Sequence, residues 1–250
     1  MSAKRTNHVW DPLADSRQDK LRADRQPRTP QSMSPAYRLA YADDDFLCRE
    51  ELRPVRLQLE LLKSEMILME AGIRSTVVMF GGARIPEPGK EPWAAKNETQ
   101  AKNLTAASRY YDEARSFARL CSTHSLTTKG QEYVVCTGGG PGVMEAGNRG
   151  AHDVGAASIG LNVVLPHEQA PNEYVTPEFS LNFHYFAIRK MHFLMRAKAI
   201  TIFPGGFGTM DELFETLTLI QTGRMEHVPL ILFGSEFWNS IVDFQALADF

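Results

Sequence analysis

The chain has 250 residues, 43% of them hydrophobic, and a formal net charge of −3. This length suits one sizeable α/β domain with extensions, and the near-neutral charge disfavours a nucleic-acid binder, which would present a basic face. No apolar run reaches the roughly 18 residues that a membrane span needs. The amino terminus also lacks the apolar core of a signal peptide, and the three cysteines have neither zinc nor redox spacing. The sequence therefore predicts a soluble, cytoplasmic protein without membrane or nucleic-acid partners.

Three regions follow one another along the chain. Residues 1–36 are polar and carry charges of both signs with few apolar groups, so we predict a disordered arm. Residues 37–72 contain apolar residues at helical spacing and end near Gly72, a plausible helix stop, which predicts an N-terminal helical extension. Residues 73–250 are richer in apolar runs and helical patterns, and they are expected to form the main folded domain.

In this core, short apolar runs alternate with helical patterns. The first run, Val77 to Phe80, stops at a pair of glycines, and later runs read "EYVVC", "ASIGLNVVLP", "AKAITIF" and "VPLILFG". Apolar runs bounded by glycines suit strands buried on both faces. Alternating strands and helices indicate a parallel sheet covered on both sides. We predict an α/β, Rossmann-like doubly wound parallel sheet, with "SLNFHYFAIRKMHFLMRAKA" as one of its helices.

Three glycine-rich turns follow predicted strands, at 81–82, 138–142 and 205–208. Ligands of such sheets bind beyond the carboxyl ends of the strands. Glycine lets the backbone approach an anion, and the helix that follows presents free N–H groups. For any one turn, glycine as a simple turn former remains the alternative. Together the turns favour a phosphate site.

Neither of the longer turns matches a standard nucleotide motif. "GGGPGVMEA" has no Gly-Lys-Ser/Thr ending, so it is not a P-loop. It also lacks the last glycine of the dinucleotide pattern, and no acidic residue ends the next predicted strand, which disfavours NAD. The sequence indicates no cofactor.

The stretch "IFPGGFGTMDELFE" combines a glycine turn with acidic residues. Thr209 is suited to contact a phosphate oxygen at the start of the helix. Asp211 and Glu212 fall in its first turn, where the helix dipole alone favours a carboxylate. In the functional interpretation, one of them faces the ligand and acts as a base or stabilises an oxocarbenium-like centre.

Arg189 and Lys190 lie in an apolar helical pattern before this turn. Such cations can simply extend from a core helix to the surface. A planar guanidinium is, however, a good partner for phosphate or developing charge, and the anion-binding turn downstream favours a functional role. His184 and His192 flank the pair without metal-binding spacing, so no metal site is expected.

The segments "TGGGPGVMEAGNRGA", "RKMHFL" and "PGGFGTMDE" together resemble the Lonely Guy (LOG) family, also labelled lysine decarboxylase-like. The last segment matches the pattern Pro-Gly-Gly-x-Gly-Thr-x-x-Glu at every fixed position, and the resemblance covers roughly residues 73–238. It implies a Rossmann-like fold and a homodimer or higher homo-oligomer with sites near the subunit interface. It also implies hydrolysis of the N-glycosidic bond of a nucleoside 5′-monophosphate, such as AMP or a cytokinin riboside monophosphate.

The resemblance also implies roles for residues at matching positions. Arg189 and Glu212 would form the catalytic pair, and Glu145 would face the ribose hydroxyls. The substrate-binding set would comprise Gly139, Gly140, Glu145, Lys190, Gly205, Gly206, Gly208 and Thr209. Decarboxylation would instead require a pyridoxal phosphate lysine, and Lys190 has no evident pyridine-nitrogen partner in the sequence.

Two other functions remain open at this point. One is a non-catalytic carrier of a nucleotide or phosphorylated cofactor, since some relatives resemble molybdenum-cofactor carriers. The other is an interaction protein led by the N-terminal arm. Arg189 and Glu212 favour the enzyme, because a carrier has no need of that pair. The sequence does not identify the base.

Overall fold

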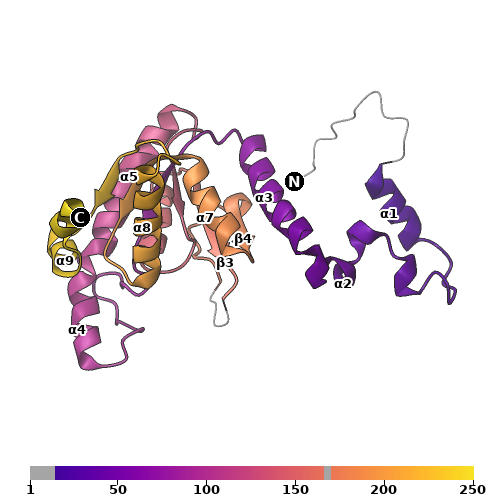
Figure 1. Cartoon of the computed structure of the whole chain (residues 1–250), viewed down its shortest axis with the longest axis horizontal. Helices are drawn as coiled ribbons and strands as arrows, with labels where there is room; N and C mark the ends of the chain where they lie inside the picture. Colours follow the sequence, from indigo (N-terminus) through magenta and orange to yellow (C-terminus); the bar gives the residue numbers. More distant parts are fainter. Residues whose placement is uncertain (1–14, 166–169) are drawn as a thin grey trace. The chain divides into compact units, whose positions relative to one another are not determined.

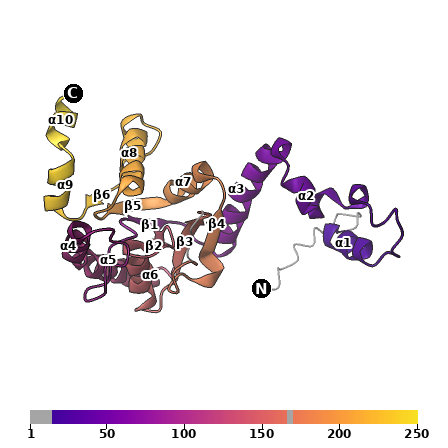
Figure 2. The same cartoon turned by 90° about the horizontal axis from the view of Figure 1, so that it is seen from below.

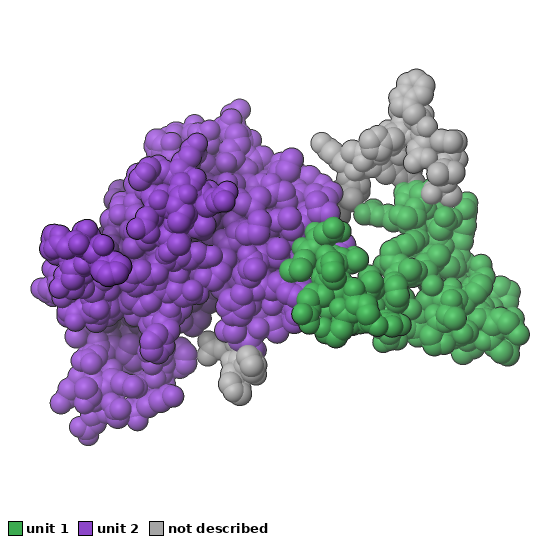
Figure 3. Space-filling view, viewed as in Figure 1, with its two compact units in different colours: residues 1–58 green, residues 59–250 purple. Residues whose placement is uncertain are grey.

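The computed structural model describes residues 15–165 and 170–250 (Figure 1). The chain divides into two compact units, residues 1–58 and 59–250, which Figure 3 colours separately. The boundary lies within a helix, so the extension expected at 37–72 is shared between the units. Within the described ranges, none of the helices combines the length and apolar character that a bilayer-spanning segment needs.

The first unit is built from short helical segments. Helix α1 (Ser16–Asp24) starts at Asp15, whose side chain accepts a hydrogen bond from the Arg17 amide, and it contains no buried residue. Thus part of the range expected to be a disordered arm forms a helix, while residues 1–14 lie outside the described residues. Helix α2 (Asp44–Leu47) follows, after 3₁₀ turns at Pro35–Tyr37 and Ala40–Ala42 and before another at Glu50–Leu52.

Helix α3 (Arg53–Glu70) confirms the predicted helix and its stop signal. Gly72 has a φ of 75°, a conformation that glycine adopts without steric cost. The Ile73 amide then donates to the Leu68 carbonyl at 2.9 Å, which closes the helix end. Leu68 is buried, so this end of the helix is anchored in the second unit.

The second unit contains a six-stranded sheet in which all neighbouring strands are parallel, in the order β4-β3-β2-β1-β5-β6. This order confirms the Rossmann-like doubly wound fold. The strands are β1 (Thr76–Phe80), β2 (Val134–Thr137), β3 (Ser158–Val163), β4 (Ser180–Phe183), β5 (Ala197–Ile202) and β6 (Leu230–Leu232).

Helices cover both faces of this sheet (Figure 2). On one face, α5 and α6 enclose a core that includes Met79, Tyr111, Ala118, Val135 and Val143. On the other face lie α7 and α8 (Figure 2). The helices of this unit after α3 are α4 (Glu98–Ala107), α5 (Arg109–Thr127), α6 (Val143–His152), α7 (Phe186–Met195), α8 (Phe207–Gln221), α9 (Ser235–Ile241) and α10 (Phe244–Asp249).

One sequence interpretation is wrong. The segment at 180–199 was expected to be a single helix, but its first four residues form β4, which pairs with β3 through Leu161 and Leu181. Leu181 and Phe183 are buried while Asn182 is exposed, an alternation of period two that is typical of a strand. Four residues are too few for this alternation to outweigh the helical pattern that follows.

The strand order places a topological switch point between β1 and β5. The chain leaves β1 toward β2 on one side, whereas β5 pairs with β1 on the other side. Phe80 and Ile202, the last residues of these strands, are register partners. The crevice beyond such paired carboxyl ends is where sheets of this class bind ligands.

Candidate functional site

The three glycine turns meet at this switch point and are hydrogen-bonded to one another. The Gly82 amide donates to the Pro204 carbonyl at 2.9 Å, which joins the turn after β1 to the turn after β5. The Val143 amide donates to the Gly82 carbonyl at 3.2 Å, which joins the turn after β2. The predicted anion-binding turns therefore lie together at one edge of the sheet.

Two glycines of the β2 turn are required by a positive φ and by close neighbouring atoms. Gly139 has a φ of 74°, and a Cβ atom there would lie 2.2 Å from Asn162 Oδ1. Gly142 has a φ of 69°, and a Cβ atom would lie 2.4 Å from the Gly82 carbonyl oxygen. Both contacts are far inside van der Waals distance, so a larger residue would displace the Asn162 side chain at the first position and force the two turns apart at the second.

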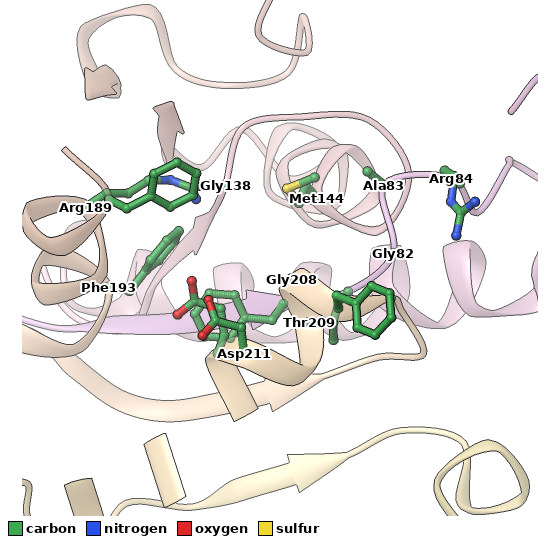
Figure 4. Close-up of a pocket in the computed structure, with 16 residues that line it drawn as sticks. Gly82, Ala83, Arg84, Gly138, Met144, Arg189, Phe193, Gly208, Thr209 and Asp211 are labelled. Atoms are coloured by element: carbon green, nitrogen blue, oxygen red, sulfur yellow. The ribbon is translucent and has the colours of Figure 1, made fainter. Parts of the chain in front are cut away.

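A cleft of about 380 Å³ opens beside these turns (Figure 4). In Figure 4 Arg189 reaches toward Gly138, while Thr209 and Asp211 approach from α8. The lining comes from four segments, namely the end of β1 with its turn, the β2 turn with α6, helix α7, and the start of α8. Its residues are Phe80, Gly81, Gly82, Ala83, Arg84, Gly138, Met144, Phe186, Arg189, Phe193, Gly206, Phe207, Gly208, Thr209, Asp211 and Glu212.

The start of α8 has the character of an anion site. Its N-cap residue is Gly206, which has no side chain to satisfy the first amides of the helix. The helix dipole places partial positive charge at this end. Thr209 is buried and lines the cleft one residue after Gly208. Gly205 does not line the cleft, since its Cα faces Thr209, whose Oγ1 would lie 2.1 Å from an added Cβ.

Glu212 contributes a buried carboxyl to the same cleft. Only 7% of the residue is exposed. Burial raises the pKa of Glu212 to about 7, against the lowering effect of Lys190, whose Nζ lies 3.7 Å from Glu212 Oε1. A carboxyl with this pKa can exchange a proton near neutral pH, which suits general acid–base chemistry.

Arg189 lies across the cleft from α8 and is held in place by several contacts. Its Nε donates to the Leu161 carbonyl at 2.7 Å, and its guanidinium lies 5.1 Å from the centre of the Phe193 ring. A Cβ atom on Gly138 would lie 2.7 Å from Arg189 Nη2, so glycine is needed at that position for the guanidinium to approach. The structure thus brings Arg189 and Glu212 to one cleft.

Lys190 contacts carboxylates of α8 instead. Its ammonium lies 2.9 Å from Asp211 Oδ2 and 2.7 Å from Glu215 Oε2. Burial lowers the pKa of Lys190, but the contacts with Asp211 and Glu215 outweigh it, and the pKa is raised overall. Lys190 does not line the 380 Å³ cleft, so its link to the site is the ion pair with Glu212.

A smaller cleft of about 270 Å³ adjoins the first and shares Ala83, Gly138, Met144 and Arg189 with it. Gly139 and Gly140 line this second cleft. The turn is held from outside by Asn172, whose side-chain amide donates to both of their carbonyls at 3.0 Å. Gly139 and Gly140, to which the family resemblance assigns substrate binding, therefore lie beside the Arg189 guanidinium, in a cleft next to the start of α8.

Glu145 lines neither cleft. It lies on α6, and its Oε1 accepts a hydrogen bond of 2.7 Å from the Tyr111 hydroxyl. Burial raises the pKa of Tyr111, which keeps this hydroxyl protonated as a donor. The structure does not bring Glu145 together with the other sequence-predicted residues.

Several residues of the site were not predicted from the sequence. Arg84 follows the Gly81-Gly82 turn, and its charge beside a glycine turn was an available signal. Met144, Phe186 and Phe193 gave no such signal, because apolar residues in helices are expected in any core. Asn172 acts through a contact across the fold that the sequence does not reveal. Within residues 15–165 and 170–250, no group of three or more His, Cys, Asp or Glu gathers to hold a metal ion.

Residues 144–249 match the family model described as "Possible lysine decarboxylase". The cytokinin riboside 5′-monophosphate phosphoribohydrolase LOG2 of Arabidopsis thaliana is 28% identical over 137 residues, which cover 54% of this chain and 60% of that protein. LOG3 of the same plant is 27% identical over 113 residues, 44% of this chain and 51% of that protein. The chain thus spans between half and three fifths of the length of these relatives.

Among solved structures, the chain is similar to the molybdenum cofactor binding protein of Rippkaea orientalis. The TM-score is 0.43 and the identity 17%, over 70% of this chain and 85% of that one. The molybdenum cofactor carrier protein of Chlamydomonas reinhardtii has a TM-score of 0.40 and an identity of 16%, over 70% of this chain and 86% of that one.

Proposed function

We propose that the chain hydrolyses the N-glycosidic bond of a nucleoside 5′-monophosphate, as its similarity to the family model and to the cytokinin riboside 5′-monophosphate phosphoribohydrolases supports. The products are the free base and ribose 5-phosphate. The proposed substrates are of the AMP or cytokinin riboside monophosphate type, and the names of the relatives support the second of these. The protein is then an N-glycosidase.

The start of α8 is the proposed phosphate anchor. Gly206 and Gly208 leave the backbone amides accessible, and Thr209 adds a hydroxyl on the same side of the cleft. Backbone amides at a helix terminus bind phosphate without any further cation. A substrate held here by its 5′-phosphate has its ribose within one helical turn of Glu212.

Glu212 is the proposed acid–base group. In the reaction a water oxygen bonds to C1′ of the ribose, the C1′–N bond breaks, and its electron pair leaves with the base. One proton of the water passes to the solvent or a carboxylate, and the departing base takes up a proton. A carboxylate beside the ribose can accept the water's proton and stabilise the positive charge that develops on the ring. The buried position and raised pKa of Glu212 support this role.

Arg189 is the proposed partner of the phosphate or of the developing charge. It faces the cleft from α7, opposite Glu212 on α8. The hydrogen bond from Nε to Leu161 fixes the plane of the guanidinium. A guanidinium so held can donate to a planar or anionic group without reordering. Substitution of Arg189 by alanine is therefore expected to slow turnover and to weaken nucleotide binding.

The observation that carries this proposal is that the uncapped α8 terminus and the buried Glu212 line the same cleft. The test incubates the protein with a panel of nucleoside monophosphates and the matching nucleosides and assays free base. Cleavage of AMP without cleavage of adenosine is expected, because only AMP carries the group that α8 anchors. Equal rates on both would show that the glycine turns are not a phosphate anchor. Binding of AMP without release of adenine would instead favour the carrier.

The proposal includes a homodimer or higher homo-oligomer in the cytoplasm, where nucleotides are present. Large apolar side chains are exposed on α7 and α8, among them Met191, Met195 and Phe214. Phe207, at the edge of the cleft, is 96% exposed. A second subunit would cover such side chains. Light scattering coupled to size exclusion would measure the oligomer, and a monomer at micromolar concentration would contradict it.

A further inference from the structure

Two carboxylates of α3 hold the two ends of α7. Glu60 accepts hydrogen bonds from the amides of His184 at 2.8 Å and Tyr185 at 3.1 Å, directly before α7 begins. Glu65 accepts two hydrogen bonds from the Arg196 guanidinium, at 2.8 and 2.5 Å, directly after α7 ends. All of these residues belong to the second unit.

These contacts supply what α7 lacks in its own sequence. The helix has no acidic residue in its first turn, and its N-cap residue, Tyr185, provides no side-chain cap. A carboxylate at this end satisfies exposed amides and interacts favourably with the helix dipole. Glu60 therefore acts as a cap that another helix provides. Arg196 is mostly buried, and the bidentate pair with Glu65 neutralises it.

The capped end of α7 is also the end that carries Arg189. The Arg189 amide donates to the Tyr185 carbonyl at 3.2 Å, so the residue lies one turn after the amides that Glu60 binds. The neighbouring Lys190 links α7 to Asp211 and Glu215 of α8. A shift at the start of α7 would thus displace the guanidinium from Gly138 and from the cleft.

We propose that Glu60 and Glu65 of α3 are positioning residues that hold α7 so that Arg189 faces the cleft. This inference rests on the proposed function. It gives the N-terminal extension a role in turnover, although α3 contributes no residue to the cleft lining. Neither carboxylate contacts substrate in this arrangement; each acts through α7.

Glu60→Gln is the decisive variant, because it keeps the side-chain shape and removes the charge that caps two amides. Glu70→Gln, an exposed position on the same helix, is the matched control. We expect Glu60→Gln to lower kcat for AMP roughly tenfold at temperatures well below melting, since small misplacements of catalytic groups cost one to two orders of magnitude. Glu60→Asp, which keeps the charge, is expected to recover part of the rate, and Glu70→Gln to match the wild type.

A double-mutant cycle separates positioning from general destabilisation. If Glu60 acts through Arg189, Glu60→Gln causes no further loss of rate in an Arg189→Ala background. Additive losses, or an unchanged kcat in Glu60→Gln, would overturn the inference.

Amide hydrogen exchange of residues 184–190 gives a readout that does not depend on turnover. We expect faster exchange there in Glu60→Gln and not in Glu70→Gln, because the capped amides lose an acceptor. Unchanged exchange would overturn the inference even if the wild type cleaves AMP. If the wild type cleaves no nucleotide, the proposed function fails, and the exchange result still decides whether Glu60 holds α7.

Discussion

The Lys190 ammonium lies 3.7 Å from the Glu212 carboxylate, yet the pKa of Glu212 is raised to about 7. Burial outweighs the nearby cation because Lys190 is shared with Asp211 and Glu215, which it contacts at shorter distances. Two further carboxylates around one ammonium also disfavour a negative charge on Glu212. The result is a buried carboxyl that changes its charge near physiological pH, beside the helix terminus proposed to hold phosphate.

This arrangement predicts the effect of Glu212→Gln on turnover. The amide has nearly the same shape but can neither accept a proton nor carry charge, so kcat for AMP is expected to fall on the order of 10²-fold or more. Nucleotide affinity, measured by calorimetry, is expected to stay close to that of the wild type, because the glycine turns and Thr209 remain. Glu215→Gln is the control: it removes a contact of Lys190 and does not line the cleft. If Glu212→Gln cleaved AMP at the wild-type rate, Glu212 would only stabilise the start of α8 and would have no catalytic role.

The same carboxyl predicts a pH dependence of stability. The pKa of Glu212 is about 7 in the folded protein and near the ordinary 4.5 once the chain unfolds. Its contribution to stability is therefore present in full below pH 4.5 and is lost as the pH rises toward 7. We expect Glu212→Gln to unfold with a free energy up to about 3 kcal/mol higher than the wild type at pH 8, and with a difference near zero at pH 4.5. Urea titrations at both pH values measure this. A larger gain at pH 4.5 than at pH 8 would contradict the assigned cause.

The surroundings of Gly139 predict how much stability a side chain at this position costs. Gly139→Ala introduces a side chain at a φ of 74° and places it against Asn162. Gly155→Ala is a matched control, with a φ of 70° and no atom within 4 Å of the added carbon. Each substitution is expected to cost about 1–2 kcal/mol for the backbone conformation, and Gly139→Ala about 1–3 kcal/mol more for overpacking. Urea denaturation measures the difference between the two variants. Equal losses would mean that Asn162 moves aside without cost.

The sequence predicted the sheet and the turns because each depends on local pattern. Apolar runs ending in glycine marked β1, β2 and β5. The helix signal after the last of these turns singled out Thr209 and Glu212, and both line one cleft in the structure. β4 was not predicted because its four residues lie just before α7. A period-two pattern this short cannot be distinguished from the beginning of the longer helical pattern that follows it.

The parts of the site that depend on tertiary contacts were not predictable in the same way. Glu145 is adjacent to the β2 turn in sequence, but the Tyr111 hydroxyl on α5 binds its carboxylate away from both clefts. Lys190 follows Arg189 directly, yet the helix rotates successive side chains by about 100°, so the two cations point to different surroundings. Glu60 lies more than a hundred residues from the amides that it caps, and no local signal connects them.

Deletions at the amino terminus test whether stability and turnover depend on the arm at residues 1–36 or on helix α3. Helix α1 contains no buried residue, so removal of residues 1–36 is expected to leave melting temperature and turnover nearly unchanged. Removal of residues 1–72 takes away Glu60 and Glu65 as well as the buried Leu68, and is expected to lower both strongly. Thermal melting and adenine release from AMP, measured on the two truncated proteins, test this. A large loss on removal of residues 1–36 alone would show that the arm is docked structure, and that the contribution of the N-terminal region to the site begins before α3.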